Sequence, residues 1–283
     1  MDGMITWRIS RFFKQGGAEE IDDRVVVELP LEIIVNGMPL VALMRLPGMD
    51  KELAVGFCLT EKIIDDVRQV KLLKHCGQRE EAAGRSEEAA SDGEAGENPL
   101  DRGNVVELEV ESPHDRERFT PTYVVRTGCG GADLSALEDY AEGVVDSPLR
   151  VAAGLVMELG EKLAAGQDIF HATGGTHGAG IFDTEGRVLV VSEDVGRHNA
   201  LDKAVGWCAL RSVPLEDKIL MLSGRVSYEM ALKAVRVRIP VVVSLAAPTS
   251  LGLRVAERAG LTVVGFCGGE RCNVYTHGWR VKP

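Results

Sequence analysis

The chain has 283 residues, and its 45% hydrophobic content is enough to form one large domain or two modest ones. Its formal net charge of -11 argues against general binding to nucleic acid or to anionic membranes, because both reward positive charge. The apolar runs are far shorter than the about 18 residues that cross a bilayer, and the N-terminal sequence MDGMITWRISRFF lacks the apolar core of a signal peptide, so we expect a cytoplasmic protein without a membrane partner.

The first third of the chain is rich in short β-branched runs. Residues 24–46, RVVVELPLEIIVNGMPLVALMRL, contain Pro30 and the turn pair Asn36-Gly37, which together predict a β-hairpin. Residues 50–64, DKELAVGFCLTEKII, follow with the apolar spacing of a helix.

Residues 78–104 form an acidic insertion. They contain eight acidic residues and three arginines but no aromatic residue, so they cannot bury enough apolar surface to offset the entropy of ordering. We expect a solvated, disordered loop there. After it, residues 104–112 and 119–127 alternate like two paired strands. Residues 1–127 are therefore predicted to form a β-rich N-terminal region.

The pattern changes to alternating helices and strands in the second half. Residues 147–166, SPLRVAAGLVMELGEKLAAG, predict a helix with Leu155, Leu159 and Leu163 on one stripe. Residues 169–194, IFHATGGTHGAGIFDTEGRVLVVSED, predict a strand and then a hairpin.

Three further strands are predicted by short apolar segments, and a helix follows each of the first two. The strand segments are KILML (218–222), PVVVSL (240–245) and LTVVGF (261–266). The two helices that follow are SYEMALKAVRV (227–237) and SLGLRVAERAG (250–260), and a further helix, NALDKAVGWCALR (199–211), precedes the first of these strands. This alternation predicts an α/β domain over residues 128–283, with a mostly parallel sheet covered by helices.

The predicted strands end in small, hydroxyl-bearing or charged residues. The segments SEDVGRHN, SGRVS, AAPTS and CGGERCN follow four successive strands. In such sheets ligands bind beyond the carboxyl ends of the strands, and helix N-termini favour anions there. With Arg197, Arg225 and Arg271 added, this edge can hold a diphosphate. The other interpretation is ordinary helix capping by Ser223, Ser227, Thr249 and Ser250.

Other site types receive less support from the sequence. Neither a P-loop motif nor a G-x-G-x-x-G motif between strand and helix occurs. His198 is a candidate site residue because it follows Arg197 close to Glu193 and Asp194, and His177 is a second candidate in a glycine-rich turn.

A structural metal is not expected. Cys267, Cys272 and His277 are zinc-ligand types, but their spacing differs from the C-x2–4-C of structural zinc sites and a fourth ligand is missing. The six cysteines are scattered and should be reduced, with Cys58 and Cys208 in the core; they are Cys58, Cys76, Cys129, Cys208, Cys267 and Cys272.

Cys129 is the strongest candidate for covalent chemistry. It lies between glycines in VVRTGCGGADLSAL, after a strand-like run and before a potential helix. A free thiol with a pKa near 8.5 is only a few per cent thiolate at neutral pH, but Arg126, free backbone N–H groups and a helix start can lower that pKa. Residue 132 is Ala132, so a local C-x-x-C redox pair is excluded.

Several long motifs resemble the formate dehydrogenase accessory sulfurtransferase (FdhD) family. They are LPLEIIVNGMPL, LAVGFCLTEKII, SEDVGRHNALDK, SGRVSYEM, and APTSLGLRVAERAGLTVVGF running into GERCNVYT. The resemblance implies a cytidine-deaminase-like α/β fold used without its zinc, and a homodimer. It also implies transfer of persulfide sulfur from a cysteine desulfurase to the molybdenum bis(molybdopterin guanine dinucleotide) cofactor before that cofactor enters formate dehydrogenase.

The resemblance also assigns residues. Cys129 matches the persulfide cysteine of the family, and the stretch from 266 to 271 matches its cofactor-binding segment. The full set of expected cofactor-binding residues is Phe266, Cys267, Gly268, Gly269, Glu270, Arg271, Arg197, His198, Ser223 and Arg225. Family members often carry a second cysteine where this chain has Ala132. Two alternatives stay open: a cofactor-binding chaperone without catalysis, and a zinc hydrolase of the deaminase type.

Overall fold

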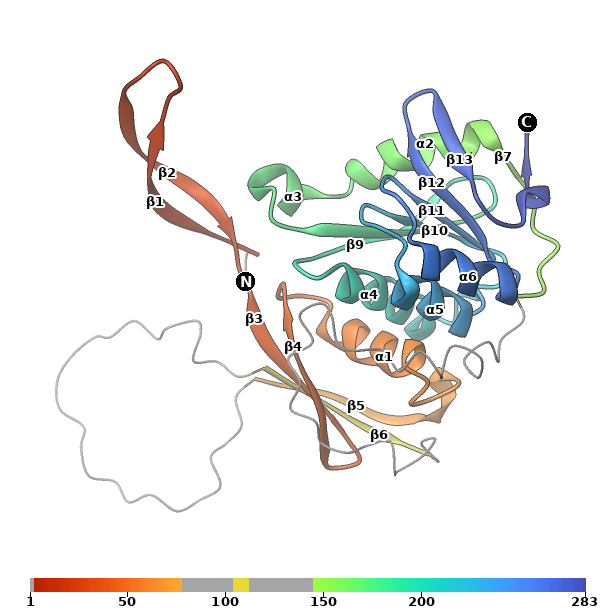
Figure 1. Cartoon of the computed structure of the whole chain (residues 1–283). Helices are drawn as coiled ribbons and strands as arrows, with labels where there is room; N and C mark the ends of the chain where they lie inside the picture. Colours follow the sequence, from red (N-terminus) through yellow and green to blue (C-terminus); the bar gives the residue numbers. More distant parts are fainter. Residues whose placement is uncertain (1–2, 78–103, 112–144) are drawn as a thin grey trace, which may run out of the picture.

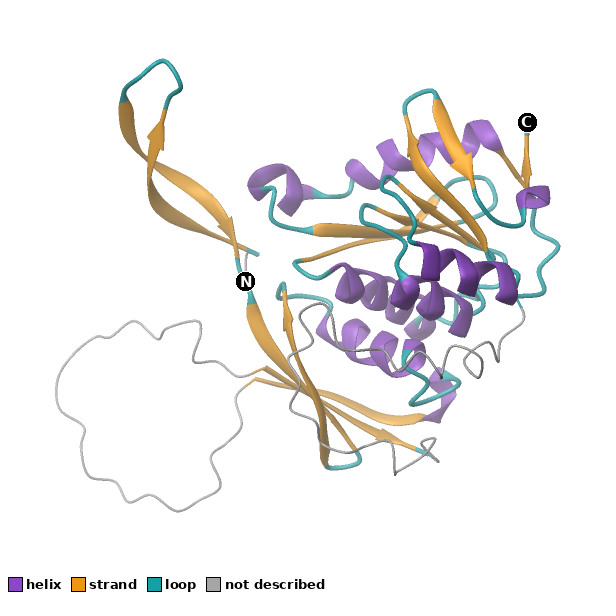
Figure 2. Ribbon diagram, viewed as in Figure 1, coloured by secondary structure: helices purple, strands orange, loops and turns teal. Residues whose placement is uncertain are grey.

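The computed structural model describes residues 3–77, 104–111 and 145–283 (Figure 1). It has a mixed α/β fold with two principal sheets, and most of its helices lie between them (Figure 2). The predicted acidic insertion and the predicted strand over 119–127 lie outside the described residues, as does the loop that carries Cys129.

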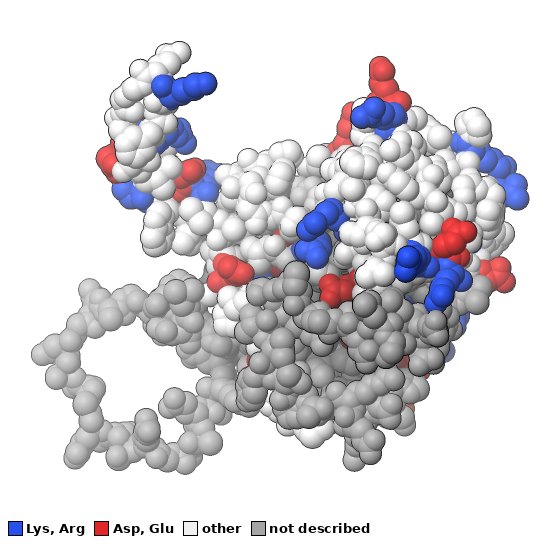
Figure 3. Space-filling model, viewed as in Figure 1, with Lys and Arg blue, Asp and Glu red and all other residues white. Residues whose placement is uncertain are grey.

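The N-terminal region begins with a two-stranded ribbon, which projects from the rest of the molecule (Figure 1). Its strands are β1 (Met4–Phe12) and β2 (Ala18–Val26), paired antiparallel. The ribbon carries both basic and acidic side chains (Figure 3), and a guanidinium nitrogen of Arg8 lies 3.1 Å from a carboxylate oxygen of Asp22 across the two strands. Elsewhere on the face shown in Figure 3, Lys and Arg appear as separate groups rather than as one basic surface.

A four-stranded sheet follows, in the order β4-β3-β6-β5. Its elements are β3 (Leu29–Val35), β4 (Met38–Arg45), α1 (Asp50–Thr60), β5 (Val70–Gly77) and β6 (Asn104–Val110). Alternate residues of β3 are buried against α1, as period-two patterning requires. The predicted hairpin turn is confirmed, because Asn36 and Gly37 both have positive φ, 50° and 76°. The predicted helix over 50–64 ends earlier, at Thr60.

A six-stranded sheet forms the C-terminal half, in the order β13-β12-β11-β10-β8-β9. Its strands are β8 (His177–Phe182), β9 (Val188–Asp194), β10 (Ile219–Leu222), β11 (Val241–Ser244), β12 (Thr262–Gly268) and β13 (Arg271–Val274). The short strands β7 (Val151–Ala152) and β14 (Val281–Lys282) pair separately. Every residue of β10 and β11 is buried, as expected for strands covered on both faces.

The prediction of a mostly parallel sheet is wrong at the level of strand pairs. Within the six-stranded sheet, the pairs β10–β11 and β11–β12 are parallel, whereas β8 and β13 run against their neighbours. The reason is local, since β8 and β9, like β12 and β13, are joined by short hairpin turns, and a tight turn can join only antiparallel strands.

Helices cover both faces of this sheet. α2 (Ala153–Ala164) packs on one face; α4 (Arg197–Leu210), α5 (Tyr228–Arg236) and α6 (Ser250–Ala259) lie on the other, toward the N-terminal region (Figure 1). Leu159 and Leu163 of the predicted stripe are fully buried, and so is Cys208.

Residues 169–194, predicted as a strand and then a hairpin, begin instead with a short helix, α3 (Asp168–Thr173), and the hairpin strands β8 and β9 follow it. The carboxylate of Glu193 accepts hydrogen bonds from the backbone N–H groups of Ile169 (2.9 Å) and Phe170 (2.7 Å). These bonds satisfy N–H donors of the first helical turn that have no partner within the helix. Because they come from another part of the chain, the amino-acid composition of residues 169–173 gives no sign of them. None of the helices in the described ranges is long and apolar enough to cross a membrane.

The two halves meet where α1 crosses α4 with glycine on both sides. A Cβ atom at Gly56 would lie 1.8 Å from the carbonyl oxygen of Asp202, and one at Gly206 would lie 1.9 Å from that of Glu52. The two backbones are therefore in direct contact, which only glycine permits at these positions.

Two buried ion pairs flank this crossing. Lys203 lies 2.7 Å from Asp194 and also donates to the carbonyl of Leu46 at 2.8 Å. Lys233 lies 2.8 Å from Asp202, whose other oxygen accepts a bond from the Thr60 hydroxyl at 2.7 Å. Each pair thus joins the C-terminal helices to the N-terminal region through hydrogen bonds that satisfy the buried charges.

We expect Gly206→Ala to lower the free energy of unfolding by about 3 kcal/mol, because the added methyl group collides with the backbone of α1. Gly154→Ala is the matched control, since it also lies in a helix but has no atom within 4 Å of the place that the new methyl group would take. Alanine is the better helix former, so that control should be neutral or up to about 1 kcal/mol more stable. Urea denaturation measures both. Equal stabilities for the two variants would contradict the close crossing.

Candidate functional site

The loops that follow β10, β11 and β12 form one hydrogen-bonded edge of the sheet. The hydroxyl of Ser244 donates to the carbonyl of Gly224 at 2.7 Å, and the backbone N–H of Phe266 donates to the carbonyl of Ala246 at 3.1 Å. Val226 and Pro248 form an additional bridge between the first two loops. The strand ends predicted from the sequence to converge are therefore tied to one another.

Arg197 and Arg225 lie at this edge, one at the start of α4 and one in the loop after β10. The point where a Gly224 side chain would begin is 3.6 Å from Cδ of Arg197 and 3.4 Å from Nδ1 of His177. The Nε atom of Arg197 is buried, with no hydrogen-bond partner among the residues that the structure describes. A buried donor without a partner is costly, so an anion beside it would be stabilising.

Ser223 does not act as the helix cap that was considered from the sequence. Its hydroxyl accepts a bond from the backbone N–H of Gly178 at 2.9 Å and so ties β8 to the loop after β10. Thr249, in contrast, caps α6 by accepting from the N–H of Gly252 at 3.2 Å. The structure thus gathers Arg197, Ser223 and Arg225 at one edge, and their contact with a cofactor stays a prediction.

His198 has an acidic partner, although not one of those nearest in the sequence. Its Nε2 atom lies 2.9 Å from a carboxylate oxygen of Glu229 in α5. Burial lowers the pKa of His198 to about 4, and the positive charges of Arg197 and Lys233 act in the same direction. Glu229 acts in the opposite direction, but the imidazole remains neutral at neutral pH.

Glu193 and Asp194 are occupied elsewhere, in the contacts to α3 and Lys203 described above. Glu229 was missed by sequence reasoning because 31 positions separate it from His198 and only the packing of α4 against α5 brings them together. The sequence contains no spacing signal for such a pair.

The predicted cofactor segment, residues 266–271, forms the β12–β13 hairpin. Phe266 has a positive φ of 51° at an irregularity in the strand pairing, and 46% of its surface is exposed. Such a backbone is strained for an aromatic residue and is typical of functional positions. Gly269 forms the turn with φ 64°, and Glu270 and Arg271 are exposed beside it.

Cys267 differs from the rest of that segment, because its side chain is fully buried. Its thiol donates to the carbonyl of Val156 at 3.2 Å. Burial, and then the neighbouring Cys272, raise its pKa to about 12. Only the backbone of Cys267 is thus placed to meet a ligand.

The zinc-ligand types considered in the sequence make other contacts. The ring of His277 lies 2.9 Å from the carbonyl of Glu257, and Cys267 bonds to Val156. Within residues 3–77, 104–111 and 145–283, no group of three or more His, Cys, Asp or Glu side chains is arranged to hold a metal ion.

Cys129 and Arg126 lie outside the described residues, so the roles predicted for them stay predictions. Among the described cysteines, Cys58 and Cys208 are buried like Cys267, and burial raises the pKa of each to about 12. At pH 7 such a thiol is thiolate about once in 10⁵ molecules, which makes it a poor nucleophile.

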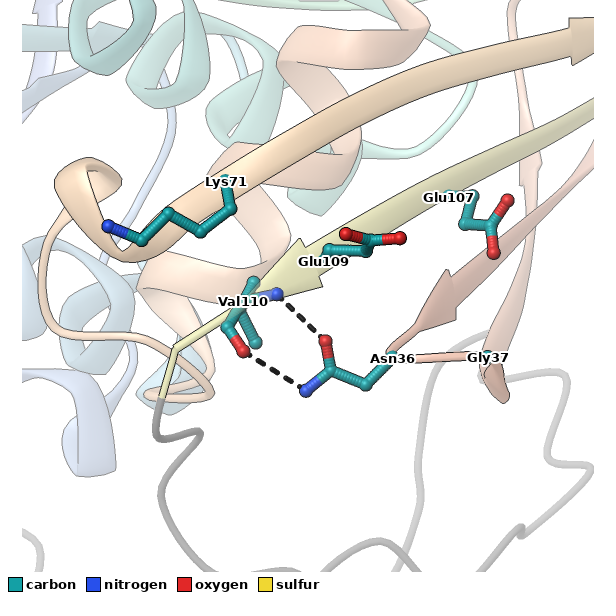
Figure 4. Close-up of a pocket in the computed structure, with 6 residues that line it drawn as sticks. All are labelled: Asn36, Gly37, Lys71, Glu107, Glu109 and Val110. Atoms are coloured by element: carbon teal, nitrogen blue, oxygen red, sulfur yellow. Dashed lines mark hydrogen bonds between the residues drawn. The ribbon is translucent and has the colours of Figure 1, made fainter.

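A polar depression lies elsewhere, on the four-stranded sheet. It is lined by Asn36, Gly37, Lys71, Glu107, Glu109 and Val110 (Figure 4). The Asn36 side chain there donates to the carbonyl of Val110 and accepts from its N–H, at 3.1 and 2.8 Å. These bonds extend the pairing of β3 with β6, so we interpret Asn36 as a structural residue.

Comparison with known proteins gives a consistent set of relatives. The model of the FdhD/NarQ family matches residues 26–282. The sulfur carrier protein FdhD of Nocardia farcinica is 39% identical over 292 aligned positions, covering 100% of this chain and 97% of that protein. The protein of the same name from Saccharolobus solfataricus is 33% identical and covers 97% of this chain and 98% of its own length.

A solved structure has a similar fold. It is the crystal structure of a protein assigned as a formate dehydrogenase accessory protein, from Desulfotalea psychrophila. The TM-score is 0.73 at 22% sequence identity, and the match covers 99% of each chain. At this level of identity the likeness establishes the arrangement of the chain.

The pKa of His198 predicts a pH dependence of stability. Because its folded pKa of about 4 is below its ordinary 6.5, the stability it contributes is complete above pH 6.5 and is lost as the pH falls toward 4. The loss can reach about 3 kcal/mol. His198→Gln should therefore lose less stability over this range than the wild type, as measured by urea midpoints. His171→Gln, at an exposed histidine, is the control and should follow the wild type.

Burial also predicts unequal cysteine reactivity within the β12–β13 hairpin. Cys272 is partly exposed, whereas Cys267 is buried with a pKa of about 12. Iodoacetamide should modify Cys272 of the native protein at least about tenfold faster than Cys267, because the thiolate is the reactive species. Peptide mass spectrometry over a time course measures the two rates. Equal rates in the folded protein would contradict the buried position of Cys267.

Proposed function

The chain belongs to the FdhD/NarQ family, and we propose that it is a sulfur carrier that serves the maturation of formate dehydrogenase. In this proposal it accepts persulfide sulfur from a cysteine desulfurase and passes it to the molybdenum bis(molybdopterin guanine dinucleotide) cofactor, which is its substrate. The single observation that carries the proposal is full-length similarity, at 33–39% identity, to proteins named as sulfur carriers.

Cys129 is the proposed sulfur anchor. In the sequence it lies between Gly128 and Gly130, which have no side chains, and Arg126 lies three positions before it. The high pKa values of Cys58, Cys208 and Cys267 support this choice by contrast, because those thiols are protonated and enclosed at neutral pH. A carrier needs a thiolate that a second protein can reach.

Two sulfur transfers make up the proposed reaction. The Cys129 thiolate attacks the terminal sulfur of the desulfurase persulfide, forms a new S–S bond and releases the desulfurase cysteine as a thiolate. Delivery to the cofactor as sulfide then breaks the S–S bond and consumes two electrons. Since residue 132 is alanine, no second thiol at that position can supply them. We propose that two molecules of an external thiol supply the two electrons and leave joined as one disulfide, which returns Cys129 to its thiol form.

The strand-end loops are the proposed binding surface for the cofactor. A dinucleotide carries diphosphates, and Arg197 and Arg225 with the N-terminus of α4 offer positive charge and N–H donors to such groups. The unpartnered Nε of Arg197 supports this assignment. Exposed Phe266 offers an aromatic face at the same edge, and Arg271 adds a cation on the adjoining hairpin.

The remaining parts of the proposal follow from the family. We propose that the protein acts in the cytoplasm as a homodimer, and that its C-terminal half has a cytidine-deaminase-like arrangement without zinc. A cofactor with two guanine dinucleotides suits a site shared by two subunits.

Sulfur loading tests the role of Cys129. After incubation of the wild type with a cysteine desulfurase and cysteine, intact-mass spectrometry should detect one added sulfur, and peptide mapping should place it on Cys129. Cys129→Ala should lose this sulfur, and Cys76→Ala, a partly exposed cysteine elsewhere, should retain it. Equal loading of Cys129→Ala and the wild type would refute the assignment.

A second candidate function is a cofactor-binding chaperone without sulfur chemistry, and Ala132 favours it because the chain has lost one thiol often found in the family. The two functions differ in cells that lack their own copy of this protein. If Cys129→Ala restored formate dehydrogenase activity to wild-type level there, the chaperone function would be preferred.

A further inference from the structure

His177 is a basic side chain at the strand-end edge that the proposal above does not use. It is the first residue of β8 and faces the loop after β10, with Nδ1 3.4 Å from the point where a Gly224 side chain would begin. Arg197 approaches the same point to 3.6 Å, and Arg225 is the next residue in the loop. The side chains of His177 and Arg197, from two elements, therefore lie beside a position without a side chain, and the charge of Arg225 from the adjoining loop position also acts on the imidazole.

The backbone holds His177 in this place. The N–H of Gly178 donates to the Ser223 hydroxyl at 2.9 Å, and the N–H of Ser223 donates to the Gly178 carbonyl at 3.0 Å. These two bonds fix the start of β8 against the loop that carries Gly224 and Arg225. A ligand that reaches Arg225 thus meets the imidazole without any rearrangement of the sheet.

The carboxylates that border His177 are already engaged. Asp194 is opposite His177 in β9, but it lies 2.7 Å from the ammonium of Lys203 and is fully buried. Glu193, the next residue, accepts bonds from the N-terminus of α3 and from the Thr176 hydroxyl. The charges that face the imidazole from α4 and from the loop after β10 are positive.

We infer that His177 is a third contact for a phosphate group held by Arg197 and Arg225, and that it makes this contact in its protonated form. A nucleoside diphosphate is the ligand class, because its phosphates can accept from two guanidinium groups and one imidazolium at once. The inference rests on the proposed function, since it deepens the description of the same edge. It adds that phosphate binding is coupled to proton uptake.

The electrostatics give the direction of this coupling. Without a ligand, burial lowers the pKa of His177; Arg197 and Arg225 lower it further, and Asp194 opposes them. A bound phosphate reverses the sign of the nearest charge and so raises that pKa. The complex then binds more protons than the free protein, and affinity must fall as the pH rises. One histidine contributes at most about tenfold in affinity per pH unit.

Calorimetric titration of the full chain with GDP tests the inference. The dissociation constant is measured from pH 6 to pH 8, and proton uptake is obtained from two buffers with different ionisation enthalpies. Comparison with His177→Gln removes the protonation of GDP itself, which both proteins share. We expect the wild-type affinity to fall at least about threefold more than that of His177→Gln over this range, with correspondingly greater proton uptake.

His171→Gln is the matched control, because His171 is exposed on α3 and its ring bonds to the carbonyl of Ala164 at 2.8 Å. It should follow the wild type. Arg197→Gln separates the inference from the proposed function. If GDP binds, weakens on loss of Arg197, and yet shows the same pH slope with and without His177, the inference is overturned while the site stands. If GDP binding is absent or indifferent to Arg197, the proposed site itself fails.

Discussion

The contact between α1 and α4 is the constraint on which the arrangement of this molecule depends. Gly56 and Gly206 allow the two helix backbones to touch, and no other residue type fits there without separating the helices. Arg197, a residue of the strand-end site, is the first residue of α4 and so belongs to the same rigid helix that contacts α1. Separation of the two helices would therefore disturb the site as well as the core.

Buried charges make this contact specific. Hydrophobic packing alone would tolerate sliding of one helix along another, but the ion pairs Lys203–Asp194 and Lys233–Asp202 lose much of their stabilisation if either partner moves. Asp194 serves both regions, since it accepts a bond from the backbone N–H of Leu46 at 3.2 Å. A residue at a strand end thus positions one half of the protein on the other.

The strand-end site combines fixed and free donors. The hydroxyl of Ser223, which accepts a hydrogen bond, and that of Ser244, which donates one, hold the loops in place, so little ordering is needed when a ligand binds. Arg197 keeps a donor unpaired among the described residues, and His177 can change its charge when an anion arrives. This division of roles suits the proposed function, in which a polyanionic cofactor is bound and later released.

The sequence by itself determined the helices α1, α2, α4, α5 and α6, the strands β10, β11 and β12, the Asn36-Gly37 turn and the family, because these depend on local periodicity, turn chemistry and long motifs. It also indicated that Arg197, Ser223 and Arg225 lie at one edge, since the carboxyl ends of neighbouring strands meet there. Only the tertiary structure decided the antiparallel pairing of β8 with β10, the burial of Cys267, and the pairing of His198 with Glu229. These depend on residues far apart in the chain, whose distances are fixed by helix packing and carry no periodic signal in the sequence.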